Sequence, residues 1–264
     1  MSIRSLHIWS AGDYDRIAAG FRDGAADFVE RQGLKAGMSV LDAACGSGNV
    51  TIPAALTGAD VTGLDIVPDL LAITAERAAQ EHVEVTLQQG TVERMPYALA
   101  RFDMVLSMFG TMFAARPDQV MVELARVTRP GGRLALANWT RSGFVGQMLA
   151  LHVAAVPSPP GLPSVLLWGD DDAVRERFDP DLWRVSTTPR TITFRYPHSS
   201  AATAELFLRC YGPTVRTLEA LDEGGQMSLA NALTDHWVRH QRRDGAEGTT
   251  LVDAEYLEVV AIRR

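Results

Sequence analysis

Cysteine is scarce in this sequence, and long apolar runs are missing. Only Cys45 and Cys210 occur in 264 residues. We therefore expect no disulfide scaffold, and both cysteines are predicted to be small buried side chains. No stretch of about 18 or more apolar residues occurs, so a membrane-spanning helix is not expected. The first residues, MSIRSLHIWSAGDYDR, have no apolar core of the kind found in signal peptides, which favours a cytoplasmic protein.

Positive charge is also in deficit. The 32 acidic residues outnumber the 25 lysines and arginines, which gives a formal net charge of −7. An acidic surface repels the phosphate backbone of nucleic acids, so we expect no nucleic-acid partner.

The first half of the chain alternates between short apolar runs and segments with helical periodicity. Strands separated by helices predict a parallel sheet with right-handed crossovers. The predicted strands are 39–44, 60–65, 83–88, 102–108 and 133–139, and the predicted helices are 13–31, 49–56, 69–81 and 117–128, with a turn at 129–132.

The pattern changes beyond residue 140, where helices dominate. The predicted elements here are helices at 143–156, 170–177, 200–211 and 224–243, a proline-rich loop at 157–164, an extended segment at 183–197 and a strand at 249–264.

The stretch VLDAACGSGNVT, residues 40–51, places two glycines between a strand and a helix. Dinucleotide-binding folds have a third glycine in the pattern G-x-G-x-x-G, and Thr51 stands at that position here. No lysine follows the turn, so it is not a phosphate loop of the Walker type. The carboxylate of Asp42, beneath the turn, would repel a pyrophosphate and attract an ammonium group. An NAD(P)-dependent oxidoreductase is therefore the less favoured alternative.

Five segments in this order resemble the motifs of the class I S-adenosylmethionine-dependent methyltransferases. They are VLDAACGSGN (40–49), VTGLDI (61–66), QQGTVERMPY (88–97), FDMVLSMFG (102–110) and LARVTRPGGRLALANW (124–139). The resemblance implies a Rossmann-like α/β fold with a mostly parallel seven-stranded sheet, helices on both faces and a helical lid insertion. It also implies S-adenosylmethionine as the cofactor.

The same resemblance implies roles for particular residues. Asp65 would bind the ribose hydroxyls, and Asp42 would lie near the ammonium of the methionine end. Thr91 stands where many relatives have an aspartate that contacts adenine, so Val92 is expected to pack on the adenine instead. The residues expected at the cofactor are Tyr14, Asp42, Ala44, Gly46, Ser47, Gly48, Asn49, Asp65, Ile66, Thr91, Val92, Glu93 and Ser107.

The turn after 102–108 lacks the motifs of methyltransferases that act on macromolecules. Relatives that methylate nucleic-acid amino groups have Asp, Asn or Ser before Pro-Pro-aromatic, and protein arginine methyltransferases have glutamates, whereas this chain has SMFG (107–110). No carboxylates cluster at the ends of the fourth and fifth predicted strands, so no metal is expected. The side chains of Met108, Phe109, Met112 and Phe113 favour a small, partly apolar acceptor methylated at O, N or C, although core packing explains them equally well.

The chain is longer than a minimal fold of this family, in which the last two strands form a hairpin. About 50 residues separate the extended segment from the final strand. We expect one structural domain with an insertion. Its parts are 1–142, a cofactor-binding core with an N-terminal lid helix; 143–248, helical cap segments plus a strand near 183–197; and 249–264, the final strand. This pattern is similar to the small-molecule branch that includes the ubiquinone and menaquinone C-methyltransferases, although YDRIAAGF (14–21) departs from their N-terminal signature.

Candidate catalytic side chains are few. Tyr14, His152 and Tyr211 are the candidates, although a core histidine with satisfied hydrogen bonds or a packing tyrosine explains them as well. Further candidates for the pocket or the surface are Trp9, Trp139, Trp168 and His198. A non-catalytic protein that binds S-adenosylmethionine is therefore an alternative, and the acceptor and the oligomeric state are left open.

Overall fold

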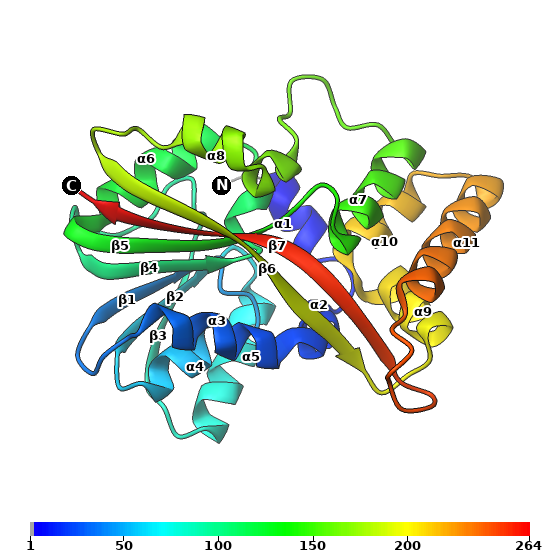
Figure 1. Ribbon diagram of the computed structural model, residues 1–264, viewed down its shortest axis with the longest axis horizontal. Helices are drawn as coiled ribbons and strands as arrows, with labels where there is room; N and C mark the ends of the chain where they lie inside the picture. Colours follow the sequence, from blue (N-terminus) through cyan, green and yellow to red (C-terminus); the bar gives the residue numbers. More distant parts are fainter. Residues whose placement is uncertain (1–2) are drawn as a thin grey trace.

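A computed structural model describes residues 3–264, with side chains from Ser5 onward. Its centre is a seven-stranded sheet of order β3-β2-β1-β4-β5-β7-β6 (Figure 1). The strands are β1 (Ser39–Ala43), β2 (Asp60–Asp65), β3 (Val85–Gln89), β4 (Phe102–Met108), β5 (Thr128–Trp139), β6 (Trp183–Tyr196) and β7 (Thr250–Arg263).

The sheet is mixed. The first five strands pair in parallel with one another, and β7 runs antiparallel to both β5 and β6. The central strand β4 is buried over most of its length, as expected for a strand covered on both faces. The predicted α/β class and the seven strands are confirmed, and the antiparallel pairs arise because the last strand in the chain enters between β5 and β6.

Helices cover both faces of the sheet. In Figure 1, α3, α4 and α5 lie below it and α6 and α8 lie above it. The helices are α1 (Ile3–Trp9), α2 (Tyr14–Ala18), α3 (Arg22–Gln32), α4 (Thr51–Leu56), α5 (Pro68–Gln80), α6 (Pro117–Val127), α7 (Phe144–Ala155), α8 (Asp171–Arg177), α9 (Ser200–Cys210), α10 (Gly212–Glu219) and α11 (Glu223–His240), with 3-10 helices η1 (Ala19–Phe21), η2 (Thr111–Phe113) and η3 (Val165–Gly169). Within residues 3–264, none of these helices is long and apolar enough to cross a bilayer.

The two long strands β6 and β7 continue past the rest of the sheet as a two-stranded ribbon. They pair along their whole length, whereas β5 pairs only with residues 256–262 of β7. The helices α7, α9, α10 and α11 gather around this extension, at the right of Figure 1. Rings of Phe194 from β6, Phe144 from α7 and Trp237 from α11 contact one another there, so the helical segments and the sheet share one core.

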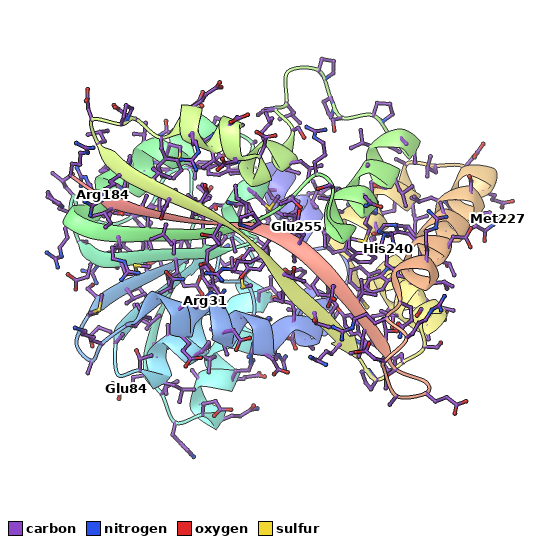
Figure 2. The ribbon with its side chains drawn as sticks, viewed as in Figure 1. Arg31, Glu84, Arg184, Met227, His240 and Glu255 are labelled. Carbon is purple, nitrogen blue, oxygen red and sulfur yellow. The ribbon has the colours of Figure 1, made fainter. Side chains whose placement is uncertain are left out.

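An ion pair connects the N-terminal half of the chain to the last strand. Arg31 lies on α3 (Figure 2), and its guanidinium donates to Glu258 Oε2 at 2.8 Å and to the Tyr256 hydroxyl at 2.7 Å. Glu258 is buried. A partly buried, hydrogen-bonded pair of this kind is costly to break from one side, because it leaves a charge without a partner.

The prediction of one continuous helix at 13–31 is wrong, because the helix is interrupted. The chain forms α2, the 3-10 turn η1 and then α3. Gly20 lies in η1, and a Cβ there would overlap the ring of Tyr196, whose hydroxyl donates to the Ile17 carbonyl at 2.6 Å. The backbone therefore tightens to admit this ring, which sequence periodicity alone does not reveal.

One further expectation differs from the structure, and two helices were not expected. The predicted turn at 129–132 lies inside β5, where the pairing with β4 shifts register between Phe102 and Met104. The left-handed φ of 73° at Gly131 accommodates this irregularity. Helices α1 and α10 were not predicted, and both are short, at 7 and 8 residues.

Candidate active site

A crevice forms where the strand order reverses. From β1 the chain proceeds outward through β2 and β3 on one side, and through β4 and β5 on the other. Loops that leave the carboxyl ends of β1 and β4 therefore diverge, and ligands of open α/β sheets bind at such a point. The glycine-containing turn leaves β1 here, and the turn at Phe109 leaves β4.

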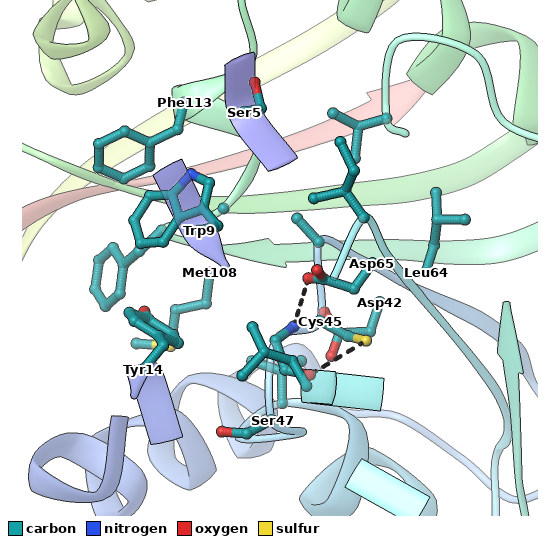
Figure 3. A pocket seen from close by; sticks show the side chains of 18 of the residues that line it. Ser5, Trp9, Tyr14, Asp42, Cys45, Ser47, Leu64, Asp65, Met108 and Phe113 are labelled. Atoms are coloured by element: carbon teal, nitrogen blue, oxygen red, sulfur yellow. Dashed lines mark hydrogen bonds between the residues drawn. The ribbon is translucent and has the colours of Figure 1, made fainter. Parts of the chain in front are cut away.

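A pocket with about 930 Å³ of empty space, part of it open to solvent, occupies this crevice (Figure 3). All of its lining residues lie between Ser5 and Ala114. The structure thus brings eleven of the thirteen residues expected at the cofactor together in one place. They are Tyr14, Asp42, Ala44, Gly46, Ser47, Asn49, Asp65, Ile66, Thr91, Val92 and Glu93.

Gly48 and Ser107 do not line this pocket, contrary to expectation. Gly48 faces α5, and a Cβ there would lie 2.9 Å from the Thr74 methyl group. The Ser107 hydroxyl is fully buried, where it donates to the Ala43 carbonyl at 2.6 Å and accepts from the Thr111 amide at 3.2 Å. Both residues therefore support the walls of the pocket from behind.

Asp65 holds the glycine turn in place. One carboxylate oxygen accepts from the Gly46 amide at 2.8 Å, and the other accepts from the Val67 amide at 2.9 Å (Figure 3). Burial raises the pKa of Asp65, and these backbone donors oppose the shift. Each carboxylate oxygen has two lone pairs, so Asp65 keeps acceptor capacity toward the pocket.

Asp42 is a second buried carboxylate at the pocket floor. It accepts a hydrogen bond from the Thr51 hydroxyl at 2.6 Å. Burial raises the pKa of Asp42 to about 7, and the nearby Asp65 contributes to the rise while the bond from Thr51 opposes it. A ligand cation would stabilise the ionised form of this carboxyl.

Two hydroxyl groups in the pocket have no protein partner among residues 3–264. The Ser47 hydroxyl is buried without a hydrogen bond. The Tyr14 hydroxyl forms none either, and burial raises the pKa of Tyr14 well above its usual value. With the two carboxylates, these groups fit a ligand that carries an ammonium, hydroxyls and a carboxylate, as S-adenosylmethionine does.

The N-terminal segment is tied to the glycine turn. The Asn49 side chain donates to the Ala18 carbonyl at 2.9 Å and accepts from Arg77 at 3.0 Å. The Tyr14 ring lies beside Gly46, where an added Cβ would be 3.6 Å away. Residues from α2 therefore form part of the pocket wall, as the sequence predicted for Tyr14.

The backbone is strained on both sides of the crevice. Ala44 has a φ of 63°, and Phe109 has a φ of 61°. Residues other than glycine rarely adopt this left-handed region, and such strain costs on the order of 1–3 kcal/mol. The Phe109 ring stacks on Trp139, and the Phe109 amide donates to the Ala137 carbonyl at 2.9 Å. These contacts hold the turn in a shape that opens the pocket.

Thr91 and Glu93 contribute mainly to loop structure. The Thr91 hydroxyl accepts from the Glu93 amide at 3.3 Å. The Glu93 carboxylate accepts from the Arg116 amide at 2.9 Å and pairs with the Arg116 guanidinium. Glu93 therefore fixes the loop before α6, and Val92 presents the apolar surface that the sequence predicted.

His152 and Tyr211 lie outside this pocket. Both ring nitrogens of His152 are engaged, Nδ1 with the Met148 carbonyl and Nε2 with the Thr214 hydroxyl, each at 2.8 Å. Burial lowers the pKa of His152 to about 4, so it is neutral near pH 7. Tyr211 lines a small aromatic cavity behind Tyr14. These contacts agree with a packing role for Tyr211, whereas His152, with both ring nitrogens engaged, lines a second cavity next to the pocket.

The remaining aromatic candidates occupy different positions. Trp168 is buried beneath the Arg177 guanidinium, and Trp139 is buried against Phe109. His198 is exposed, and Ser199 is the residue that caps α9. Among residues 3–264, no three His, Cys, Asp or Glu side chains are arranged to hold a metal ion.

The sequence named Trp9 only as a further candidate for the pocket, and the structure places it at the centre of the pocket wall. Its ring contacts Tyr14 at 5.3 Å and Phe113 at 4.9 Å between ring centroids, and Figure 3 shows the three side chains side by side. Helix α1, which carries Trp9, has only 7 residues, too few for a helical period to be recognised in the sequence. A tryptophan just before the predicted helix was the available signal.

Known proteins resemble this chain, some over its methyltransferase-like core and others over most of its length. Residues 41–136 match a family described as a methyltransferase domain. An uncharacterized protein of Mycobacterium tuberculosis is 35% identical over 216 residues, 81% of this chain and 79% of that protein. A ubiquinone/menaquinone biosynthesis C-methyltransferase of Bdellovibrio bacteriovorus is 37% identical over 109 residues, 40% of this chain and 46% of that protein. The solved YcgJ protein of Bacillus subtilis has a TM-score of 0.61 and 16% identity, covering 92% of this chain and 99% of that one.

The family match spans the glycine turn, Asp65 and the turn after β4, which are the parts that build the pocket. The sheet and its helices have the fold that the sequence motifs implied. The chain therefore belongs to the class I S-adenosylmethionine-dependent methyltransferases, and its cofactor is S-adenosylmethionine.

Proposed function

We propose that the protein transfers the methyl group of S-adenosylmethionine to an O, N or C atom of a small, partly apolar acceptor. The observation that carries this proposal is one pocket that joins the glycine turn, two buried carboxylates and an apolar wall. Met108, Phe109 and Phe113 form that wall, next to the turn after β4. We assign the helical segments of 143–178 and 198–245 as a cap on the acceptor side.

When bound, the cofactor supplies an activated methyl group, whose carbon accepts the lone pair of the acceptor while the C–S bond pair returns to sulfur. The chain then has to orient the reactants and exclude water. Asp42 would hold the ammonium, and Asp65 would accept from the ribose hydroxyls. Tyr14 stays protonated at neutral pH, so it acts as a hydrogen-bond donor. These groups favour an acceptor whose nucleophilic atom needs no protein base.

Cofactor affinity is expected to rise with pH between pH 6 and pH 8. With a pKa of about 7, the Asp42 carboxyl is mostly protonated at pH 6 and mostly ionised at pH 8. An ammonium binds the ionised form, so affinity for S-adenosylhomocysteine should increase by up to about tenfold. Isothermal titration across this range measures the slope. The Asp42→Asn variant should show a nearly flat profile, and a flat profile in the unaltered protein would remove the ammonium assignment.

Ser47→Ala is expected to separate binding from stability. The buried Ser47 hydroxyl has no partner, so its removal should leave the melting temperature unchanged or raise it slightly. Affinity for S-adenosylhomocysteine should fall about fivefold if the hydroxyl binds the ligand.

Ser107→Ala is the matched control for the melting temperature and the affinity measured with Ser47→Ala. It should lower the melting temperature, because the Ala43 carbonyl and the Thr111 amide both lose a buried partner. Unaltered affinity in Ser47→Ala would mean that the hydroxyl faces no ligand.

A thermal-shift comparison tests the proposed cofactor against its rivals. Ligands that bind only the folded state raise the melting temperature. S-adenosylmethionine and S-adenosylhomocysteine should stabilise the protein, and NAD and NADP should not. Stabilisation by NAD or NADP alone would favour an oxidoreductase. Cofactor binding without methyl transfer to any member of a metabolite library would favour a binding protein.

A further inference from the structure

A second, larger cavity adjoins the cofactor pocket. It contains about 1890 Å³ of empty space, part of it open to solvent. Trp9, Phe113 and Ala114 line both cavities, so these residues form the partition between them. The walls beyond the partition come from α7, α10 and the loop at 157–164. The turn after β4 is therefore within reach of a molecule held in either cavity.

The walls of the second cavity are largely apolar. Helix α7 presents Leu149, His152 and Val153 to it, a spacing that places all three on one helix face, and Val156, which follows the helix, lines it as well. Val153 is 50% exposed, so part of its apolar surface is free to contact a ligand in the cavity. The proline-rich loop at 157–164 forms the facing wall. Apolar walls of this kind fit an apolar ligand body.

The charge of the lining is opposite to the charge of the protein. The chain carries a net charge of −7, yet the charged residues that line this cavity are Arg141 and Arg216. Arg216 is engaged, because it donates to the His7 carbonyl and pairs with Glu219 at 2.7 Å. The Arg141 side chain is exposed and forms no ion pair or hydrogen bond with the part of the chain that the structure describes. It is a cation available to a ligand.

We propose that the second cavity binds the methyl acceptor, and that this acceptor is an apolar carboxylic acid whose carboxylate pairs with Arg141. This inference rests on the proposed function and names its substrate class. The apolar body would lie along α7, with the atom to be methylated against the partition of Trp9, Phe113 and Ala114. The contacting rings of Trp9 and Phe113 would have to separate to admit this atom to the cofactor pocket. The methyl-transfer step itself is unchanged, so Arg141 is a specificity residue distant from the reacting atoms.

Three matched probes test the charge preference: 2-naphthoate, 2-naphthalenemethanol and 2-naphthylmethylammonium. Isothermal titration into the full chain, with and without S-adenosylhomocysteine, gives each affinity. We expect 2-naphthoate to bind at least about fivefold more tightly than the alcohol, and the ammonium to bind most weakly. Equal affinities, or tightest binding of the ammonium, would overturn the proposal.

Two arginine variants and one variant of the cavity wall test whether the preference for the acid arises at Arg141. Arg141→Gln should remove the preference for the acid and leave the affinity of the alcohol unchanged. Arg184→Gln is the matched control, because Arg184 is exposed and unpaired within residues 3–264 and lies at the opposite end of the sheet (Figure 2). Val153→Asp should weaken the acid most, because it adds a like charge to the cavity wall. If Arg141→Gln and Arg184→Gln behave alike, the cation assignment is wrong.

The two proposals fail in distinguishable ways. If S-adenosylhomocysteine binds and the acid shows no preference, the methyltransferase assignment stands and the substrate class is wrong. If the acid binds through Arg141 and S-adenosylhomocysteine does not bind, the second cavity is an acid site and the proposed function fails.

Discussion

Asp65→Ala is expected to weaken binding of S-adenosylhomocysteine by at least tenfold, or about 1.4 kcal/mol. The carboxylate has two tasks that the substitution removes together. It accepts from the Gly46 amide, which shapes the turn, and under the proposed function its free lone pairs would accept from the ribose hydroxyls. The Val67 amide also loses its acceptor. Isothermal titration gives the affinity, and a melting curve gives the structural part of the loss.

Two further variants separate the loss of stability in Asp65→Ala from its loss of ligand affinity. Asp65→Asn retains one carbonyl oxygen, so it should preserve more stability than Asp65→Ala while still losing affinity. Asp60→Ala removes an exposed carboxylate from the other end of β2 and should change neither quantity. Normal affinity in Asp65→Ala would show that the ribose hydroxyls are held elsewhere.

Gly110→Ala is expected to damage both the fold and the pocket. A Cβ at Gly110 would lie 2.5 Å from the Ala44 Cβ and 2.8 Å from the Ala44 carbonyl oxygen. Both loops that leave the crevice would have to move apart. Such overpacking costs about 3 kcal/mol, which corresponds to a fall of roughly 6–12 °C in melting temperature. Affinity for S-adenosylhomocysteine should drop about tenfold or more, because Ala44 lines the pocket.

Gly224→Ala provides the contrast for this substitution. Gly224 lies in the first turn of α11, and the nearest atom to an added Cβ is an Asp222 carboxylate oxygen at 3.8 Å. Alanine favours helix over glycine, so the melting temperature should stay the same or rise. If Gly110→Ala melts like Gly224→Ala, the close approach of the two loops is not required.

The sequence predicted the parts of the site that depend on local pattern. The glycine turn and Asp65 lie at strand ends, where apolar runs stop, and this placed them at one edge of the sheet. Val92, from the segment QQGTVERMPY, and Tyr14, implied by the resemblance to the family, both lie in the pocket. The sequence pattern did not reveal that Ser107 and Gly48 face away from the pocket. Their orientation depends on which neighbouring residues fill the space behind each loop.

Long-range contacts account for what the sequence did not show. The Nε2 atom of His152 is engaged by the hydroxyl of Thr214, which lies 62 residues away in the chain. Trp9 becomes a pocket wall only because α1 packs against α10 and the loop that carries Phe113. The second cavity joins residues of α1, α7 and α10, so no single segment carries a signal for it.

The position of β7 has a consequence for the order in which the protein folds. β7 is last in the chain, yet it lies between β5 and β6 and supplies the pairing partners of both. During synthesis, β6 leaves the ribosome before its neighbour exists, so its edge stays unpaired until residues 250–263 emerge. Pairing over such separations closes long loops and is slow. The early strands can assemble first, and the ribbon of β6 and β7 is completed last.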